Sequence, residues 1–274
     1  MLDRSGASTL ATRLSNEIVR GHRDGLETIL ETRNLSKEFR GFIAVNNVNL
    51  KILRGTVHAL IGPNGAGKTT CFNLITKFIA PTSGAIFYKG NDVTNAKPAA
   101  LSRLGLVRSF QISATFPHLS VLENVRIALQ RQAGTPYCFW RSDRVLDSLN
   151  ESARRLLADV GLQELAEAEA AELSYGRKRA LEIATTIAMD PEVLLLDEPT
   201  AGMGHEDVAL IAALIRRVAK NRTVLMVEHN LSVVADLCDR ITVLARGEIL
   251  AEGTYGEIST DAAVIEAYMG VGHA

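Results

Sequence analysis

The order of hydrophobic and polar positions divides the chain into strand-like and helix-like stretches. Residues 26–61 have a mostly β pattern, with polar and apolar residues alternating over residues 45–52. Residues 56–61 form a short apolar run of the kind found in fully buried strands. A helix is predicted next over residues 68–78, followed by a strand over residues 85–88.

The pattern then becomes helical between about residues 113 and 172, apart from a break at the sequence Gly-Thr-Pro, residues 134–136. We interpret this stretch as a helical insertion, because alternating helices and strands resume after it. Helices are expected over residues 177–189, 206–220 and 231–237, and strands over residues 193–196, 223–227, 241–245 and 249–251. Apolar strands separated by helices are typical of a parallel sheet that is covered on both faces.

Composition narrows the class of protein. The 274 residues, of which 47% are apolar, are enough for one large domain with an inserted lobe. The 30 basic and 31 acidic residues nearly cancel, so no overall field favours nucleic acid as a partner. Cys71, Cys138 and Cys238 lack the spacing of metal ligands and suggest a reducing compartment. With neither a long apolar run nor the apolar core of a signal peptide, a soluble cytoplasmic chain is expected.

A glycine-rich loop joins the buried strand at residues 56–61 to the following helix. Its sequence, GPNGAGKT, fits the phosphate-binding pattern GxxxxGK[ST]. Glycines allow successive N–H groups to point at phosphate oxygens, Lys68 would meet the β and γ phosphates, and the Thr69 hydroxyl would bind Mg²⁺. A ligand-free turn would not require Lys-Thr at these two positions. The candidate nucleotide-binding residues of this loop are Gly62, Pro63, Asn64, Gly65, Ala66, Gly67, Lys68, Thr69 and Thr70.

Two acidic residues follow the apolar strand at residues 193–196. Both carboxylates are expected at the carboxyl edge of the sheet, where α/β proteins bind ligands. Asp197 is predicted to bind Mg²⁺ through water, and Glu198 to deprotonate the attacking water. The alternative is a strand end that is merely solvated, which the upstream phosphate loop disfavours.

Residues 173–177, with the sequence LSYGR, lie about 20 residues before the acidic pair, and with the two preceding motifs the chain resembles the ATPase subunits of ABC transporters. The resemblance covers about residues 27–270. It implies the ABC ATPase fold, which is a P-loop NTPase core with a mostly parallel sheet, an N-terminal antiparallel β part and a helical subdomain inserted at about residues 113–172. Residues 1–26 would be an N-terminal extension and residues 271–274 a short tail.

In this family two ATPase subunits pack head to tail, with each ATP between the P-loop of one and the signature segment of the other. The resemblance therefore implies that Ser174 and Gly176 bind the γ-phosphate held by the opposite subunit. Tyr175 and Arg177 depart from the common LSGGQ form. Gly204 stands where many members carry an aspartate that couples the two ATP sites.

Three further positions match functional residues of the family. Gln111, in the sequence VRSFQ, corresponds to the glutamine that senses Mg²⁺ or the γ-phosphate. His229 follows an apolar strand and corresponds to the histidine that orients the attacking water. Phe39 corresponds to the aromatic residue that stacks on adenine. Glu198, His229, Lys68 and Gln111 are thus the expected catalytic residues, and Thr69, Gln111 and Asp197 the expected metal site.

The C-terminal region resembles the ATPases of branched-chain amino acid importers, in residues 252–258 and 264–270. So do residues 44–48 and 181–184. The expected partners are a second ATPase subunit, identical or different, two integral-membrane permeases and, indirectly, a periplasmic solute-binding protein, with this chain peripheral on the inner face of the cell membrane. The alternatives are an ATPase of lipopolysaccharide or lipid export, a soluble non-transport ABC ATPase, and a nucleotide-dependent scaffold that has lost hydrolysis.

Overall fold

The computed structural model describes residues 27–109, 115–132 and 143–269. The predicted N-terminal extension, Gln111, the break at residues 134–136 and the C-terminal tail lie outside these ranges.

An antiparallel sheet forms the N-terminal β part. Its order is β2-β1-β5-β6, and β3 pairs with β1. The strands are β1 (Thr28–Phe39), β2 (Phe42–Val48), β3 (Lys51–Leu53), β5 (Ser83–Tyr88) and β6 (Asn91–Asp92). All of these pairings are antiparallel, as the family resemblance implied for the N-terminal β part.

A second, six-stranded sheet has the order β11-β10-β4-β9-β8-β7. Its strands are β4 (Val57–Ile61), β7 (Leu106–Arg108), β8 (Val193–Asp197), β9 (Thr223–Val227), β10 (Arg240–Ala245) and β11 (Glu248–Gly253). All neighbours are parallel except β10 and β11. The α/β class with a mostly parallel sheet is therefore confirmed.

Both faces of the parallel sheet are buried, which explains the unbroken apolar runs. Successive residues of β8 alternate between two cores: Leu194 and Leu196 face one, whereas Val193 and Leu195 face the other. The first core includes residues of α4 to α8, and the second lies between this sheet, helix α2 and the antiparallel sheet.

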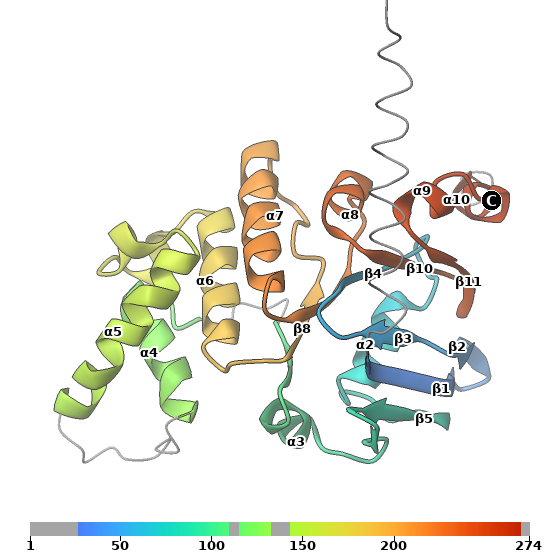
Figure 1. The fold of residues 1–274 in the computed structure, drawn as a ribbon, viewed down its shortest axis with the longest axis horizontal. Coiled ribbons are helices and arrows are strands. Elements are labelled where there is room, and N and C mark those ends of the chain that lie inside the picture. The colour runs from blue at the N-terminus through green and yellow to red at the C-terminus, as the bar shows by residue number, and fades with distance from the viewer. Residues whose placement is uncertain (1–26, 110–114, 133–142, 270–274) are drawn as a thin grey trace, which may run out of the picture.

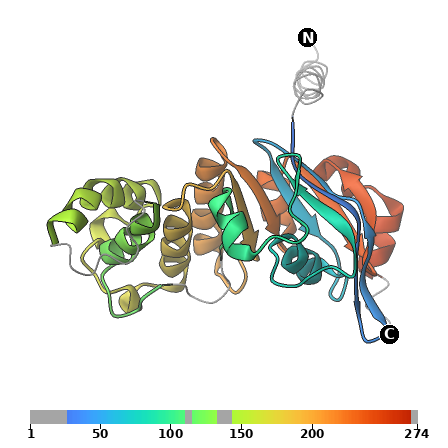
Figure 2. The same cartoon turned by 90° about the horizontal axis from the view of Figure 1, so that it is seen from below.

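The helices surround the parallel sheet and also form a separate lobe. They are α2 (Lys68–Ile75), α3 (Pro98–Arg103), α4 (Val121–Gln132), α5 (Asp143–Asp159), α6 (Tyr175–Ile187), α7 (His205–Ala219), α8 (Leu231–Leu237), α9 (Tyr255–Ile258) and α10 (Ala262–Met269), with short 3-10 turns at Gln163–Leu165 and Ala170–Glu172. Helices α4 and α5 lie beyond α6, away from the sheets, in both ribbon views (Figures 1 and 2).

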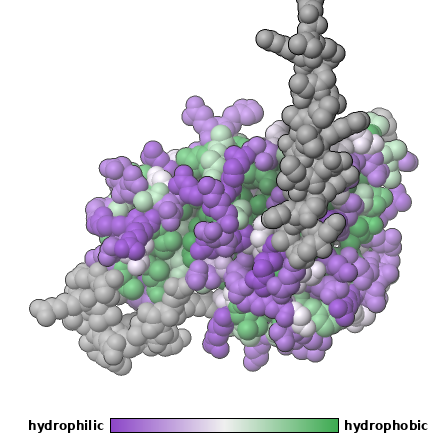
Figure 3. Space-filling view, viewed as in Figure 1, coloured by the Kyte–Doolittle hydropathy of each residue, from purple (hydrophilic) through white to green (hydrophobic). Residues whose placement is uncertain are grey.

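Among the helices that the structure describes, none combines the length and apolar character that a membrane crossing requires. Hydrophilic side chains cover much of the face seen in Figure 3.

The first helix ends earlier than the sequence pattern predicts. Helix α2 stops at Ile75, because Lys77 adopts a left-handed backbone conformation with a φ of 62°. The amides of Lys77 and Phe78 then donate to the carbonyls of Leu74 and Asn73, which closes the helix end as a Schellman motif does. A non-glycine residue at this position hides the usual sequence signal for a stop.

Candidate functional site

The phosphate-binding loop lies between the end of β4 and the start of α2, as predicted. The helix begins at Lys68, so the amides of its first turn have no partner within the helix and point toward the loop. A cavity over the loop is lined by Phe42, Ala44, Asn64, Gly65, Ala66, Gly67, Lys68, Thr69, Thr70, Glu198 and His229. Loop residues, one acid and one histidine from three parts of the chain therefore share one cavity.

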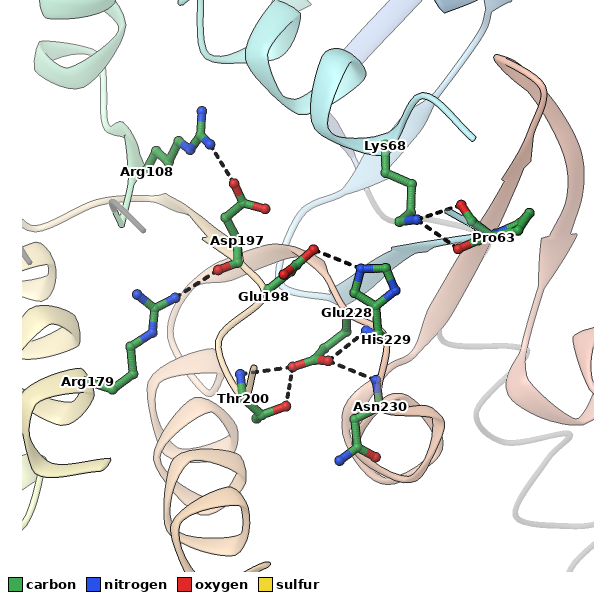
Figure 4. A network of polar contacts seen from close by, with 11 residues as sticks. Pro63, Lys68, Arg108, Arg179, Asp197, Glu198, Thr200, Glu228, His229 and Asn230 are labelled. Carbon is green, nitrogen blue, oxygen red and sulfur yellow. Dashed lines mark hydrogen bonds and ion pairs between the residues drawn. The ribbon is translucent and has the colours of Figure 1, made fainter. Parts of the chain in front are cut away.

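Lys68 is folded back onto its own loop. Its ammonium group donates to the carbonyl oxygens of Gly62 at 2.8 Å and Pro63 at 2.9 Å (Figure 4). Burial lowers the pKa of Lys68, and the negative charge of Glu198 opposes that shift. The ammonium group is thus held beside the loop by two neutral acceptors, which a phosphate oxygen can replace at little geometric cost.

Glu198 and His229 meet at the edge of this cavity. Glu198 follows β8 and His229 follows β9, and these strands are neighbours in the sheet. The His229 Nε2 and the Glu198 carboxylate lie 2.8 Å apart (Figure 4). Glu198 also adopts a φ of 44°, an uncommon conformation for a non-glycine residue. The two residues predicted at strand ends are therefore in contact, with a carboxylate and an imidazole side by side at the phosphate-loop cavity.

Glu228 braces the backbone around these two residues. Its buried carboxylate accepts hydrogen bonds from the amides of His229 and Asn230, at 2.8 and 3.0 Å, and from the amide of Thr200, at 3.1 Å. The Thr200 hydroxyl also donates to it (Figure 4). One acid thus joins the loop after β8 to the loop after β9. Sequence reasoning missed Glu228, although an acid directly after an apolar strand is the same pattern that identified Glu198.

Asp197 is the last residue of β8 and is held by two arginines. Its carboxylate pairs with Arg108 at 2.5 Å, and its carbonyl accepts a hydrogen bond from Arg179 at 3.0 Å. Arg179 is itself buried and donates to Glu182 at 2.7 Å. Sequence reasoning identified Asp197 but neither arginine, because both bonds join residues that are distant in the chain.

The residues expected to hold Mg²⁺ have suitable chemistry. A threonine hydroxyl and a carboxylate are hard oxygen ligands, and protein-bound Mg²⁺ takes few of these because phosphates and water supply the rest. Thr69 lies in the first turn of α2 on the cavity wall, and Asp197 precedes Glu198. In the described part of the chain, no three His, Cys, Asp or Glu residues cluster in a way that could hold a metal alone. Gln111, the third expected ligand, lies outside the described residues.

The signature residues lie away from the phosphate-loop cavity. Ser174 precedes α6 and Gly176 lies in its first turn. Gly176 is packed so closely that an added Cβ would lie 2.3 Å from the Asp207 carboxylate, whereas Tyr175 is 61% exposed. The start of α6 instead faces a second pocket that reaches Asp197 and Glu198.

Two phenylalanines lie at the turn between β1 and β2. Phe39 is 45% exposed, and the Lys37 ammonium group lies 5.1 Å from its ring centroid. Phe42 is 67% exposed and belongs to the cavity wall. Adenine stacking by Phe39 therefore stays a prediction, and Phe42 is an additional aromatic candidate that the sequence pattern did not indicate.

Comparison with known families gives two matches. The family described as ABC transporter matches residues 45–201. The family described as branched-chain amino acid ATP-binding cassette transporter matches residues 248–274.

Individual proteins agree with these matches. The chain is 38% identical, over 88% of its length and 98% of the relative's, to the high-affinity branched-chain amino acid transport ATP-binding protein BraF of Pseudomonas aeruginosa. A nucleotide-free ATP-binding cassette from an ABC transporter superimposes with a TM-score of 0.77 at 29% identity, covering 88% of this chain and 98% of that one. A dimeric cassette bound to ADP and phosphate superimposes with a TM-score of 0.69 at 25% identity, covering 83% and 99%.

Proposed function

Because this chain belongs to the ATP-binding cassette family of ABC transporters, we propose that it is the ATP-hydrolysing subunit of an importer for branched-chain amino acids or a related small polar solute. The observation that carries the proposal is the 2.8 Å contact between Glu198 and His229 at the edge of the phosphate-loop cavity. Binding of ATP alone would not require this pair. Hydrolysis requires a base and a group that orients it.

Each group beside the cavity has a part in the proposed mechanism. The loop amides and the start of α2 bind the phosphates, and Lys68 leaves the carbonyls of Gly62 and Pro63 to meet the β and γ phosphates. Glu198 accepts a proton from the attacking water while His229 holds that carboxylate and the γ-phosphate in register. Mg²⁺, when bound, supplies charge neutralisation at the phosphate oxygens.

The signature residues are proposed to act across a dimer. Ser174 and Gly176 lie away from the phosphate-loop cavity of their own chain, so we propose that they complete the site of a second subunit. The relation to a dimeric cassette bound to ADP and phosphate supports this arrangement. The same arrangement can form with an identical or a different second subunit, because each site combines the phosphate loop of one subunit with the signature residues of the other.

We propose further that the subunit lies on the inner face of the membrane, bound to two permeases that receive solute from a binding protein. The test is to capture the tagged chain at native expression level from gently solubilised membranes and to identify its partners by mass spectrometry. Two polytopic permeases with an amino-acid-binding protein encoded nearby are expected. Recovery of lipid-export components, or of soluble proteins alone, would contradict the importer proposal.

Adenine stacking distinguishes the two candidate phenylalanines. Phe39→Ala is expected to weaken ATP binding roughly 10-fold if its ring stacks on the base, since one such contact contributes about 1–3 kcal/mol. Phe42→Ala is the matched comparison, and binding of a fluorescent ATP analogue measures both. A larger loss in Phe42→Ala would transfer the stacking role to the residue that lines the cavity.

A further inference from the structure

The carboxylate of Asp197 is already neutralised within this chain. The Arg108 guanidinium donates to it at 2.5 Å, and the two side chains are only 12% and 3% exposed (Figure 4). A buried ion pair loses much hydration energy and is retained at little net gain in stability. A pair of this kind at the end of β8, directly before Glu198, therefore requires a functional explanation.

Arg108 has a second set of partners, all in or just after helix α2. Its Nη1 donates to Asn73 Oδ1 at 2.6 Å, and Thr76 Oγ1 lies 3.4 Å away. The rings of Phe72 and Phe78 each have their centroid 5.2 Å from the guanidinium carbon. These contacts use a different arm of the guanidinium from the one bonded to Asp197, so Arg108 can keep its position when that bond is broken.

The backbone of Asp197 is fixed independently of its side chain. Arg179, from α6, donates to the Asp197 carbonyl, and β8 pairs with β9 through Asp197 and Val227. The carboxylate can therefore turn away from Arg108 without moving the end of the strand.

We propose that Arg108 is a positioning residue that serves as the counterion of Asp197 in the metal-free protein and competes with a divalent cation for that carboxylate. The inference rests on the proposed role of Asp197 toward Mg²⁺. In the metal-free state Arg108 prevents an unpaired buried charge at the end of β8. With a cation bound beside nucleotide, the Asp197 carboxylate would be balanced by the cation instead of the guanidinium, while Arg108 would keep its contacts with Asn73, Phe72 and Phe78.

Arg108→Met tests the proposal through thermal unfolding of the full chain without nucleotide, in EDTA and in MgCl₂. In EDTA the melting temperature is expected to fall by roughly 5–15 °C, because the variant leaves the Asp197 carboxylate buried without a partner. Mg²⁺ alone should recover part of that loss, because nothing competes for the carboxylate. The wild-type melting temperature should be unchanged by Mg²⁺ alone.

Arg179→Met is the matched control. It also removes a buried arginine from Asp197 and leaves Glu182 without its partner, but it keeps the pair between Arg108 and the carboxylate. It should lose stability in EDTA with no recovery in Mg²⁺. An Arg108→Met variant that is equally insensitive to Mg²⁺ would overturn the counterion role, since a purely structural arginine predicts that result.

Two more variants keep the test decisive if Arg108→Met does not fold. Arg108→Lys keeps one positive charge but lacks the fixed fork by which two separate nitrogens bond Asp197 and Asn73, so it should show a smaller loss and a measurable response to Mg²⁺. In the double variant Arg108→Met, Asp197→Asn the neutral amide should restore the melting temperature in EDTA and abolish the response. No restoration would count against the proposal.

Nucleotide binding separates this inference from the proposed function. Binding of ATP with and without Mg²⁺ is measured on the wild type by calorimetry. A wild type that binds ATP no better with Mg²⁺ would contradict the proposed site itself. A wild type that does bind MgATP more tightly, beside an Arg108→Lys variant with no response to Mg²⁺ alone, would contradict only the counterion role.

Discussion

Replacing Glu198 with Gln is expected to stop ATP turnover while leaving ATP binding intact. Glutamine has nearly the same shape but cannot take a proton from water at neutral pH. General-base catalysis contributes typically about 10²- to 10⁴-fold, so a fall of that size is expected in the steady-state hydrolysis rate. The phosphate loop and Lys68 are untouched, so the dissociation constant for ATP should change little. Phosphate release and equilibrium binding of a fluorescent ATP analogue measure the two quantities.

Glu164→Gln is the control for this experiment. Glu164 is an exposed acid in the short turn Gln163–Leu165, remote from the cavity, and the same substitution there should change neither quantity.

The contact of 2.8 Å between Glu198 and His229 means that the two residues are expected to act together in hydrolysis. Because residues that act as a unit are not additive, the double variant Glu198→Gln, His229→Ala should be little slower than Glu198→Gln alone. Rapid hydrolysis by Glu198→Gln would remove Glu198 from the role of base.

The sequence predicts the parts of the site that come from one continuous stretch. A buried strand, a glycine-rich loop and a helix are consecutive at residues 57–75, and so are the apolar strand β8 and its two acids. The functional side chains of each motif lie at or soon after the end of a parallel strand. They lie at the same edge of the sheet, because the carboxyl ends of parallel strands lie together there. The cavity that brings Lys68, Glu198 and His229 together is therefore the part best predicted.

Contacts between distant segments are what the pattern could not predict. Arg108 lies 89 residues from Asp197, and Glu228 lies 28 residues from Thr200. Nothing in the local periodicity marks a charged residue as buried, so these side chains were indistinguishable from solvated ones. The same holds for Phe42, whose place on the cavity wall depends on how the antiparallel sheet packs against the loop.

Short elements were the other source of error. Helix α3 has six residues and strand β7 only three, too few for a period to be recognised. Helices α9 and α10 were not predicted either. Helix α9 nevertheless begins with a capping box, in which Thr254 and Glu257 bond each other's backbone, and this signal was present in the sequence. Cap residues would have identified an element that hydrophobic periodicity missed.

Replacing Gly62 with Ala is expected to destabilise the fold as well as the site. Gly62 is the first residue of the phosphate loop and has a φ of 148°, a conformation that disfavours any side chain. An added Cβ would lie 2.0 Å from the carbonyl oxygen of Leu244 on β10. The oxygen belongs to the backbone and the Cβ is fixed in place by its bond to Cα, so neither atom can turn aside, and β10 would have to move from its pairing with β4. A loss of more than about 4 kcal/mol in unfolding free energy is expected.

Gly204→Ala provides the matched control for this substitution. Gly204 precedes helix α7 with a φ of −73°, and an added Cβ would meet no atom within 4 Å. Its unfolding free energy should lie within about 0.5 kcal/mol of the wild-type value. Urea unfolding followed by circular dichroism compares the three proteins. A Gly62→Ala variant as stable as Gly204→Ala would show that the loop and β10 do not pack as described. With that packing in place, the close approach of the Leu244 carbonyl fixes where the phosphate loop starts, and so where its amides point.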